Sequence, residues 1–355
     1  MLKLLDKIVF LISILIMAGL LGAYASSFIN PNTFVFPSLL GLAYPYLLIA
    51  NIMILLYWIV RLKKMAWAVL IIILLGVPTF MTYYGTGKAQ DKEVKADIAL
   101  LSYNVRYFDV YNWSNQKGTK EKLFNYLNDY KGDIVCLQEF SLKENKQQEL
   151  AAIKQLKSYP YHYIRKDMAI FSRLPIVSRG YLPFSEQYSS ACLYCDVRLG
   201  KDTVRIYSVH LESYKLGKKE RQFMKEISQG LRGSDIPQGA RNLTTRLTTA
   251  NKNRAKQAGQ IQHHVERSPF KVILCGDFND TPLSYTYRKL KTGMKDCFIE
   301  CGRGLGNTYI GEFPSFRIDY ILYSPEFESV SYIRDTIELS DHYPIKGKLR
   351  IKNKE

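Results

Sequence analysis

Charged side chains are nearly absent from the first 84 residues of this 355-residue chain. The region holds one acidic residue, Asp6, and a few basic ones, which are Lys3, Lys7, Arg61, Lys63 and Lys64. Between these charges, apolar residues run in blocks long enough to cross a bilayer, which is not typical of a soluble domain. We therefore expect an anchor over residues 1–84 with three transmembrane helices, at about 5–25, 34–60 and 65–83.

The few charges of this anchor indicate its orientation. Lys3 and Lys7 precede the first span and Arg61–Lys64 separates the second from the third, whereas the loop at 26–32 is uncharged. The positive-inside rule then places the basic ends in the cytoplasm and everything after Tyr84 outside it. We expect a bacterial inner-membrane protein whose following domain is periplasmic. A cleaved signal peptide is the alternative for the first span, but further spans follow and no small-residue cleavage site precedes a hydrophilic chain.

The chain also lacks the cysteine and histidine clusters of a zinc or redox site. Its six cysteines all follow the anchor, at Cys136, Cys192, Cys195, Cys275, Cys297 and Cys301. Cys136 and Cys275 lie in apolar runs and are expected to be buried hydrophobic residues. The pairs Cys192/Cys195 and Cys297/Cys301 have loosely metal-like spacing, but no further ligands accompany them. Internal repeats, low-complexity tracts and Gly-rich nucleotide loops are absent as well.

After the anchor, residues 85–97 are polar and predict a short tether, and 98–355 predict a folded domain. Short apolar runs predict strands at 98–104, 134–138, 161–165, 168–172, 192–199, 204–209, 272–275, 318–323 and 346–351. Helical spacing predicts helices at about 120–130, 143–157, 216–229 and 245–266. Many strands with a few helices indicate a sheet-rich α/β domain.

The formal charge of +17 lies mostly in this domain, and it is densest in one segment. Lys215–Lys256 contains eleven Lys and Arg residues against Glu220, Glu226 and Asp235. One interpretation is a solvated basic face. The other is contact with an anionic substrate or with lipid headgroups, and the sequence favours neither.

Polar residues recur where the predicted buried strands end. They are Asn104, Glu139, His210, Asp277 with Asn279, Asp319, and Asp341 with His342. An isolated Asp or Asn at such a position is commonly just a turn residue, and the Asp277–Asp280 turn alone allows that interpretation. If the strands lie in adjacent sheets, however, their ends meet at one edge. Carboxylate, amide and imidazole groups gathered there suit a hard cation such as Mg²⁺ and an attacking water.

On these residues, the chain from about residue 97 to 352 resembles the endonuclease/exonuclease/phosphatase superfamily. The matching motifs, in order, are Ser102–Val105, Val135–Glu139, Met168–Pro175, Ser208–Leu211, Arg254–Gln257, Gly276–Asn279, Thr308–Tyr309, Arg317–Tyr320 and Ser340–His342. The resemblance implies a deoxyribonuclease-I-like α/β fold, in which two mixed β-sheets pack as a sandwich flanked by helices. It also implies a phosphoesterase site at one edge that uses Mg²⁺ or Mn²⁺.

The resemblance further implies a role for each site residue. Metal binding falls to Glu139, with Asn104 and Asp341 completing that side. Activation of water falls to Asp277 with Asn279, and contact with the phosphoryl oxygens to His210 and His342. Asp319 would orient His342.

Two arginines are candidate contacts for the substrate phosphate, Arg106 and Arg254. Several nucleases of the superfamily carry an acidic residue where this chain has Arg106, which weakens the case for a second metal.

We therefore expect a metal-dependent hydrolase that cleaves a phosphate ester, a mono- or diester in DNA, RNA or a phospholipid headgroup. The alternative is a membrane-anchored binding or scaffold module that uses the basic segment at 215–256 and has no catalytic activity.

Overall fold

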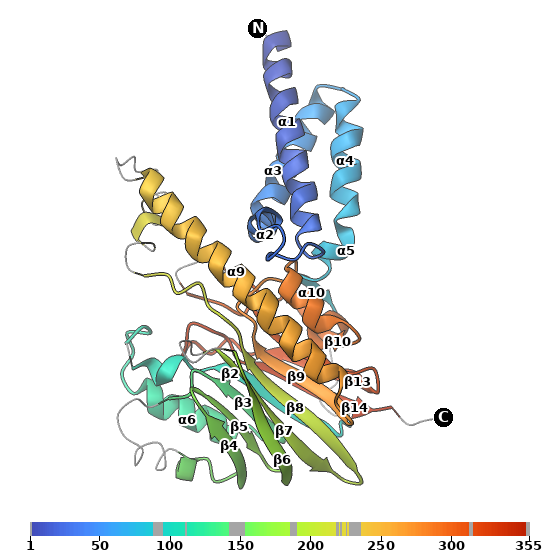
Figure 1. Cartoon of the computed structure of the whole chain (residues 1–355). Coiled ribbons are helices and arrows are strands. Elements are labelled where there is room, and N and C mark those ends of the chain that lie inside the picture. The colour runs from blue at the N-terminus through green and yellow to red at the C-terminus, as the bar shows by residue number, and fades with distance from the viewer. Residues whose placement is uncertain are drawn as a thin grey trace. The chain divides into compact units, whose positions relative to one another are not determined.

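The computed structural model describes residues 2–87, 95–110, 112–141, 153–184, 190–217, 220, 222–224, 226, 236–311 and 315–352. They form two compact units (Figure 1). The anchor unit comprises residues 1–83, 214–256 and 280–289, and the sheet unit comprises 84–213, 257–279 and 290–355.

The sheet unit contains two six-stranded mixed sheets. The first runs β13 (Phe327–Arg334), β14 (Ile345–Ile351), β2 (Ile98–Asn104), β3 (Ile134–Gln138), β5 (Met168–Ser172) and β4 (Tyr161–Arg165). The second runs β10 (Lys295–Asp296), β12 (Asp319–Tyr323), β9 (Lys271–Asp277), β8 (Asp202–His210), β7 (Ala191–Leu199) and β6 (Ile176–Pro183). A two-stranded sheet joins β1 (Tyr84–Thr86) to β11 (Arg303–Leu305).

Beyond residue 86, the described residues include the helices η1 (Arg106–Asp109), α6 (Thr119–Asp129), α9 (Ile236–Glu266), α10 (Tyr285–Lys291) and α11 (Cys297–Cys301). Two strand pairs are parallel, β2 with β3 and β8 with β9. The chain between the partners carries α6 in the first case and α9 in the second, as a parallel pair requires a crossover. The carboxyl ends of these paired strands therefore lie together, once in each sheet.

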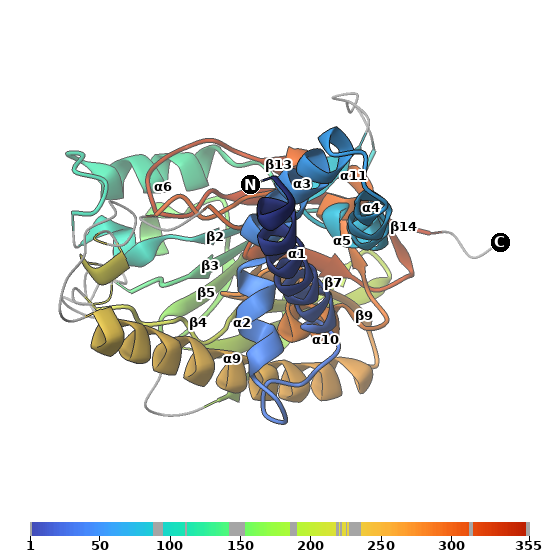
Figure 2. The same ribbon diagram turned by 90° about the horizontal axis from the view of Figure 1, so that it is seen from above.

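Alternation of buried residues explains how the layers pack. Leu100 and Cys136 of the first sheet share one apolar cluster with Ile206 and Cys275 of the second. The neighbouring residues face the other way, and in the first sheet they pack against α6 through Leu123, Phe124 and Leu127. On the second sheet the end of α9 provides the cover, where His264 Nδ1 lies 2.7 Å from the Tyr207 hydroxyl. Figure 2 shows α6 and the end of α9 on opposite sides of the strands. The predicted α/β sandwich is confirmed.

The anchor unit corrects the prediction of three full-length transmembrane helices. Its apolar helices are α1 (Leu2–Ala25), α2 (Phe36–Leu42), α3 (Tyr44–Val60), α4 (Met65–Leu75) and α5 (Val77–Phe80). Among the described residues one helix, α1, is long and apolar enough to cross a membrane, or two if α2 and α3 form one span bent by 72°.

Proline explains the break between α2 and α3 and the break between α4 and α5. Pro45 falls in the first turn of α3 and Pro78 in the first turn of α5, positions where the missing N–H costs no helical hydrogen bond. Each proline would interrupt a continuous helix, and so the predicted second and third spans are divided.

Other sequence boundaries also differ from the structure. The expected division at residues 84 and 97 is not that of the compact units, because two later segments belong to the anchor unit. The first two residues of the expected tether, 85 and 86, belong to β1, and 88–94 lie outside the described residues. Most of the helices expected at 143–157 and 216–229 falls outside them too.

Candidate active site

Three neighbouring strands of the second sheet bring His210, Asp277 and Asp319 side by side. His210 is the register partner of Asp277 between β8 and β9, and Asp277 is the partner of Asp319 between β9 and β12. All three side chains are buried. Gly276 allows this close pairing, because its φ is +139° and a Cβ there would lie 2.0 Å from the carbonyl oxygen of Val209.

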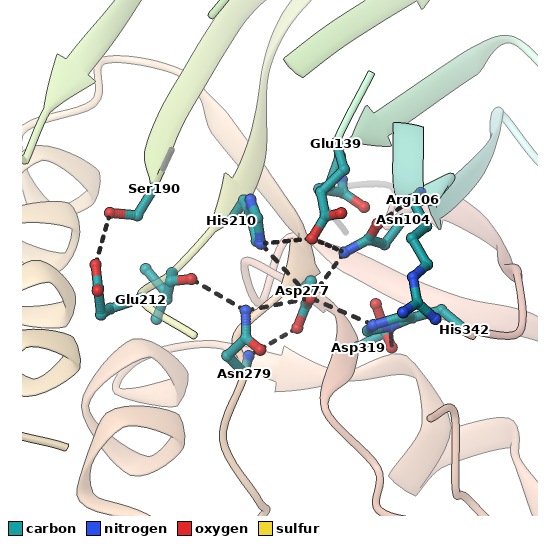
Figure 3. A network of polar contacts seen from close by, with 12 residues as sticks. Asn104, Arg106, Glu139, Ser190, His210, Glu212, Asp277, Asn279, Asp319 and His342 are labelled. Carbon is teal, nitrogen blue, oxygen red and sulfur yellow. Dashed lines mark hydrogen bonds and ion pairs between the residues drawn. The ribbon is translucent and has the colours of Figure 1, made fainter. Parts of the chain in front are cut away.

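The first sheet contributes Asn104 and Glu139 at the ends of its parallel pair. The Asn104 Nδ2 atom donates to Asp277 Oδ2 at 3.1 Å and to Glu139 Oε1 at 3.4 Å, which connects the two sheets (Figure 3). Just behind them, Gln138 Nε2 donates to Ser208 Oγ of the second sheet at 3.1 Å. Glu139 has a φ of +51°, a strained conformation for a residue with a side chain. Such strain is common where a side chain is directed into a site.

His342 and Asp319 form a buried pair. The Nδ1 atom of His342 lies 2.9 Å from Asp319 Oδ2, and its Nε2 atom lies 3.7 Å from Asp277 Oδ2. The loop carrying His342 is held in place by the Ser340 hydroxyl, which donates to the Asn104 carbonyl at 2.8 Å. Burial alone would lower the pKa of His342, but Asp319 and Asp277 outweigh it and raise that pKa to about 10. His342 is therefore an imidazolium at neutral pH.

Asp277 is the carboxylate at the centre of the site. Its Oδ1 accepts the backbone N–H of Asn279 at 2.8 Å, and Asn279 is itself fixed through Nδ2 to the Leu211 carbonyl at 3.0 Å. Burial raises the pKa of Asp277 to about 6, and Asp319 adds to the rise while the two histidines oppose it. A pKa near 6 suits a base that must be ionised at neutral pH and still accept a proton.

His210 is buried among these groups, and neither ring nitrogen has a hydrogen-bond partner among the described residues. Its Nε2 atom lies 3.7 Å from Glu139 Oε1 and 3.8 Å from Asp277 Oδ2, beyond hydrogen-bond distance. Burial lowers the pKa of His210, and so the ring is neutral. A buried imidazole with unsatisfied nitrogens next to carboxylates is costly unless a ligand completes the site.

The donor set fits a divalent cation. Burial and the nearby Asp341 raise the pKa of Glu139, which indicates a carboxylate in need of positive charge. Ligand atoms of Asp277, Asp319 and His342 also lie within 4.8 Å of one another. In that second group, however, Asp319 Oδ2 is paired with His342 Nδ1 at 2.9 Å, and one of the three ligands is a nitrogen. Glu139 with Asn104 is the better place for a cation that prefers oxygen ligands.

Asp341 and Arg106 form an ion pair, with Arg106 Nη1 at 2.7 Å from Asp341 Oδ2. The guanidinium of Arg106 also lies 5.1 Å from the centre of the Trp113 ring. Asp341, for which a metal contact was predicted, thus pairs with Arg106, for which a phosphate contact was predicted. A ligand that reaches either of them must compete with this pair.

Arg254 is not among the residues that the strand ends bring together. Its side chain is completely buried in the anchor unit, where Nε donates to Asp280 Oδ2 at 3.1 Å and Nη2 donates to Asn251. The guanidinium lies 4.4 Å from the centre of the Tyr214 ring. The sequence prediction of a phosphate contact at Arg254 is corrected, because its charge is compensated inside the protein.

Sequence reasoning missed the residues that support the site. Gln138 lies in the motif Val135–Glu139 and Ser340 in the motif Ser340–His342. Their place beside Glu139 and His342 was the signal in the sequence that could have identified them. A second network joins Glu212, Ser190 and Gln257: the Glu212 N–H donates to Gln257 Oε1 at 3.0 Å, and Gln257 Nε2 donates to Ser190 Oγ at 3.1 Å. It fixes the segment that follows His210, and Figure 3 shows its contact between the Ser190 hydroxyl and Glu212 Oε2, at 3.3 Å.

Solved structures with the same fold were found by comparison. An endonuclease/exonuclease/phosphatase family protein from Bacteroides thetaiotaomicron is 20% identical, with a TM-score of 0.53 over 72% of this chain and 98% of that one. A humanised TDP2 of D. rerio is 18% identical, with a TM-score of 0.52 over 71% and 98%. The human Nocturnin catalytic domain is 14% identical, with a TM-score of 0.50 over 72% and 93%.

No curated protein matches the chain. Residues 6–83 match a family described as a domain of unknown function, DUF8431. Residues 101–342, more than half of the chain, match the family described as Endonuclease/Exonuclease/phosphatase family. Together with the site geometry, this match indicates an enzyme that hydrolyses phosphate esters, and the chain belongs to the endonuclease/exonuclease/phosphatase family.

Proposed function

We propose that the protein is a membrane-anchored hydrolase that cleaves a phosphate ester with the help of a divalent cation, Mg²⁺ or Mn²⁺. One observation carries the proposal: strand ends from both sheets place Asn104 between Glu139 and Asp277, with Asn104 Nδ2 at 3.4 Å and 3.1 Å from their carboxylate oxygens. A binding module has no need of a buried base, an oriented imidazolium and a metal-binding carboxylate at one edge.

Asp277 is the base that takes a proton from the attacking water. Its Oδ1 accepts the Asn279 N–H, and its Oδ2 accepts from Asn104 Nδ2. Oδ2 is also the oxygen that lies beside the Nε2 atoms of His210 and His342, and so it is the atom placed to take the proton. Above a pH of about 6 this oxygen is ionised, since burial raises the pKa only that far. Asn279 keeps the carboxylate turned toward the site through its hold on the Leu211 carbonyl.

His342 and His210 bind the phosphoryl oxygens. Asp319 accepts the Nδ1 proton of His342, which leaves Nε2–H as a charged donor aimed at developing negative charge. His210 contributes a neutral donor, and a phosphoryl oxygen would give its orphaned ring a partner. Fixed donors of this kind need no reorganisation when the charge develops.

Glu139 and Asn104 would hold the cation, with Asp341 close enough to raise the pKa of Glu139. When bound, the cation supplies positive charge against the phosphoryl oxygens and makes a bound water more acidic.

The anchor unit supports a membrane location. Almost all large apolar side chains that are exposed in the described residues lie before residue 85. Arg61 pairs with Asp6 at 3.0 Å, which brings the basic ends of α1 and α3 together. The opposite end, at 26–35, is uncharged. We propose that the basic end is cytoplasmic and that α4 and α5 together make a third crossing after α1 and the bent α2–α3 pair. The sheet unit then works outside the cytoplasm, on the periplasmic side of a bacterial inner membrane.

The substrate is an anionic phosphate ester in nucleic acid or in a phospholipid headgroup. The net charge of +17 favours either. One TDP2 structure from D. rerio with this fold is a complex with a single-strand DNA product, and it supports nucleic acid as the first substrate to assay.

Release of nitrophenol from bis(p-nitrophenyl) phosphate tests the proposal. The detergent-solubilised full chain should be active with Mg²⁺ or Mn²⁺ and inactive with EDTA. Asp277→Asn should reduce kcat by about 100-fold or more. A charge-matched control is Asp202→Asn, which removes an exposed carboxylate that pairs with Lys271 at 2.9 Å. Activity that persists in EDTA, or in Asp277→Asn, would refute the mechanism.

A further inference from the structure

Two segments of the family region belong to the anchor unit, residues 214–256 and 280–289. The loop after α1 contacts both of them. Ser26 Oγ donates to the Leu283 carbonyl at 2.7 Å, and Asn32 Nδ2 donates to the Lys252 carbonyl at 3.0 Å. Leu283 is also part of one apolar cluster with Leu20, Ala23 and Tyr44 of the anchor helices. The anchor therefore packs against part of the enzyme and does more than attach it to a membrane.

A chain of polar contacts, buried at Arg254 and part-buried at Ser38, runs through this packing. Asn251 Nδ2 donates to Ser38 Oγ on α2 at 2.8 Å, and Asn251 Oδ1 accepts from Arg254 Nη2. Arg254 Nε in turn donates to Asp280 Oδ2 at 3.1 Å. We call the set Ser38, Asn251, Arg254 and Asp280 the anchor relay.

The anchor relay fixes the positions of its residues more than it stabilises the fold. Arg254 is completely buried and its partner Asp280 is nearly so. A buried ion pair adds little net stability, because desolvation offsets most of the attraction, but it holds its members in one arrangement. The planar guanidinium adds to this, since its donors point in fixed directions and here meet two acceptors at once.

The relay ends next to the catalytic turn, because Asp280 directly follows Asn279 in the chain. Resting on the proposed function, we infer that Arg254 is a positioning residue that couples the membrane anchor to the Asp277–Asn279 turn. Asp280, clamped by Arg254, fixes the chain immediately after Asn279. Asn279 has a φ of +53°, a conformation that the surrounding contacts must enforce. Loosening any member of the relay therefore loosens the turn that holds the base.

Asn251→Ala and Ser38→Ala test the inference in the full chain, because neither residue belongs to the catalytic site. With a water-soluble substrate such as bis(p-nitrophenyl) phosphate, membrane targeting cannot influence the rate. We expect Asn251→Ala to lower kcat by about 3- to 10-fold with KM changed by less than about 2-fold, since a misplaced base affects the chemical step. Ser38→Ala should act in the same direction, and the double variant should be no worse than Asn251→Ala alone.

Backbone amide exchange gives a readout that does not depend on activity. Exchange in residues 277–284 should become faster in both variants, while exchange in β3 stays unchanged. The matched control is Ser13→Ala, which removes a hydrogen bond from Trp58 inside the anchor and leaves the relay intact. It should leave both kcat and exchange in 277–284 unchanged. Arg254→Lys keeps the positive charge but loses the planar guanidinium with its fixed donors. Its kcat and its exchange rate in 277–284 should lie between those of the wild type and of Asn251→Ala.

Three results would overturn the inference. The first is unchanged exchange in 277–284 in folded Asn251→Ala and Ser38→Ala. The second is a rise in KM at constant kcat, which would mean that the relay serves substrate binding. The third is an equal effect of Ser13→Ala. If the wild type hydrolyses no phosphate ester, the proposed function fails, and the exchange data alone decide whether the relay exists. If Asn251→Ala does not fold, Ser38→Ala and Arg254→Lys decide it.

Discussion

Asp319→Asn should convert His342 from a charged to a neutral donor, and the structure sets the size of the effect. Burial works against the imidazolium, and Asp319 is the largest factor that favours it. Without that charge, the pKa of His342 should fall from about 10 toward its ordinary value of 6.5, although Asp277 and Asp341 still raise it. At a pKa of 6.5 the charged fraction at pH 8 is about 3%, against about 99% at a pKa of about 10. We expect kcat at pH 8 to fall by up to about 30-fold.

The pH profile distinguishes this loss from a structural defect. Wild-type kcat should rise through a pH of about 6, where Asp277 ionises, and stay high until a pH near 10. In Asp319→Asn the descending limb should move well below pH 10, so that the defect shrinks as the pH is lowered toward 6. Asp202→Asn serves as the control and should keep the wild-type profile. NMR titration of the five histidines would report the pKa directly. An unchanged descending limb in Asp319→Asn would refute the imidazolium role.

Three further results are expected. Glu139→Gln should weaken Mg²⁺ binding in a calorimetric titration, whereas Asp277→Asn should keep much of that affinity and still lose about 100-fold in kcat, because only the first removes a metal ligand; equal affinities would contradict the assignment. Arg317→Ala should lower the free energy of unfolding by about 3–5 kcal/mol in chemical denaturation, because it removes the cation that pairs with the buried Asp296 carboxylate; a loss below about 1 kcal/mol would contradict this role of the ion pair. Alkaline phosphatase fused after the last residue should be active, and the same reporter in the loop between α3 and α4 should be inactive; the reverse pattern would invert the topology.

The strands that carry the site were predictable because they are short apolar runs ending in polar residues. β6 and β13 were not predicted, and both have mixed burial along their length. β6 is an edge strand, and its sequence around Gly180 lacks the apolar run by which the buried strands were predicted. The start of α9 was missed for a different reason. Pro237 and Gly239 suggested a loop, yet a proline in the first turn of a helix loses no hydrogen bond.

The site itself was predicted from the same pattern, and the limits of that prediction are physical. A sequence shows that His210, Asp277 and Asp319 each end or begin an apolar run, but the register that places them in adjacent positions comes from the paired strands. Arg254 shows the limit most clearly. Its motif marked it as important, and only its burial against Asp280 reveals that the charge is directed inward.

The two halves of the site come from different sheets, and so the apolar layer between the sheets acts as its spacer. Cys136 and Cys275 belong to that layer, and they lie three and two positions before Glu139 and Asp277 respectively. A misplacement of about 1 Å at a reacting group can cost about 100-fold in rate. Side chains without any polar function therefore determine how far Glu139 stands from His210. Substitutions that change volume in this part of the core should alter turnover before they alter the fold, and so the interior of the sandwich serves catalysis as well as stability.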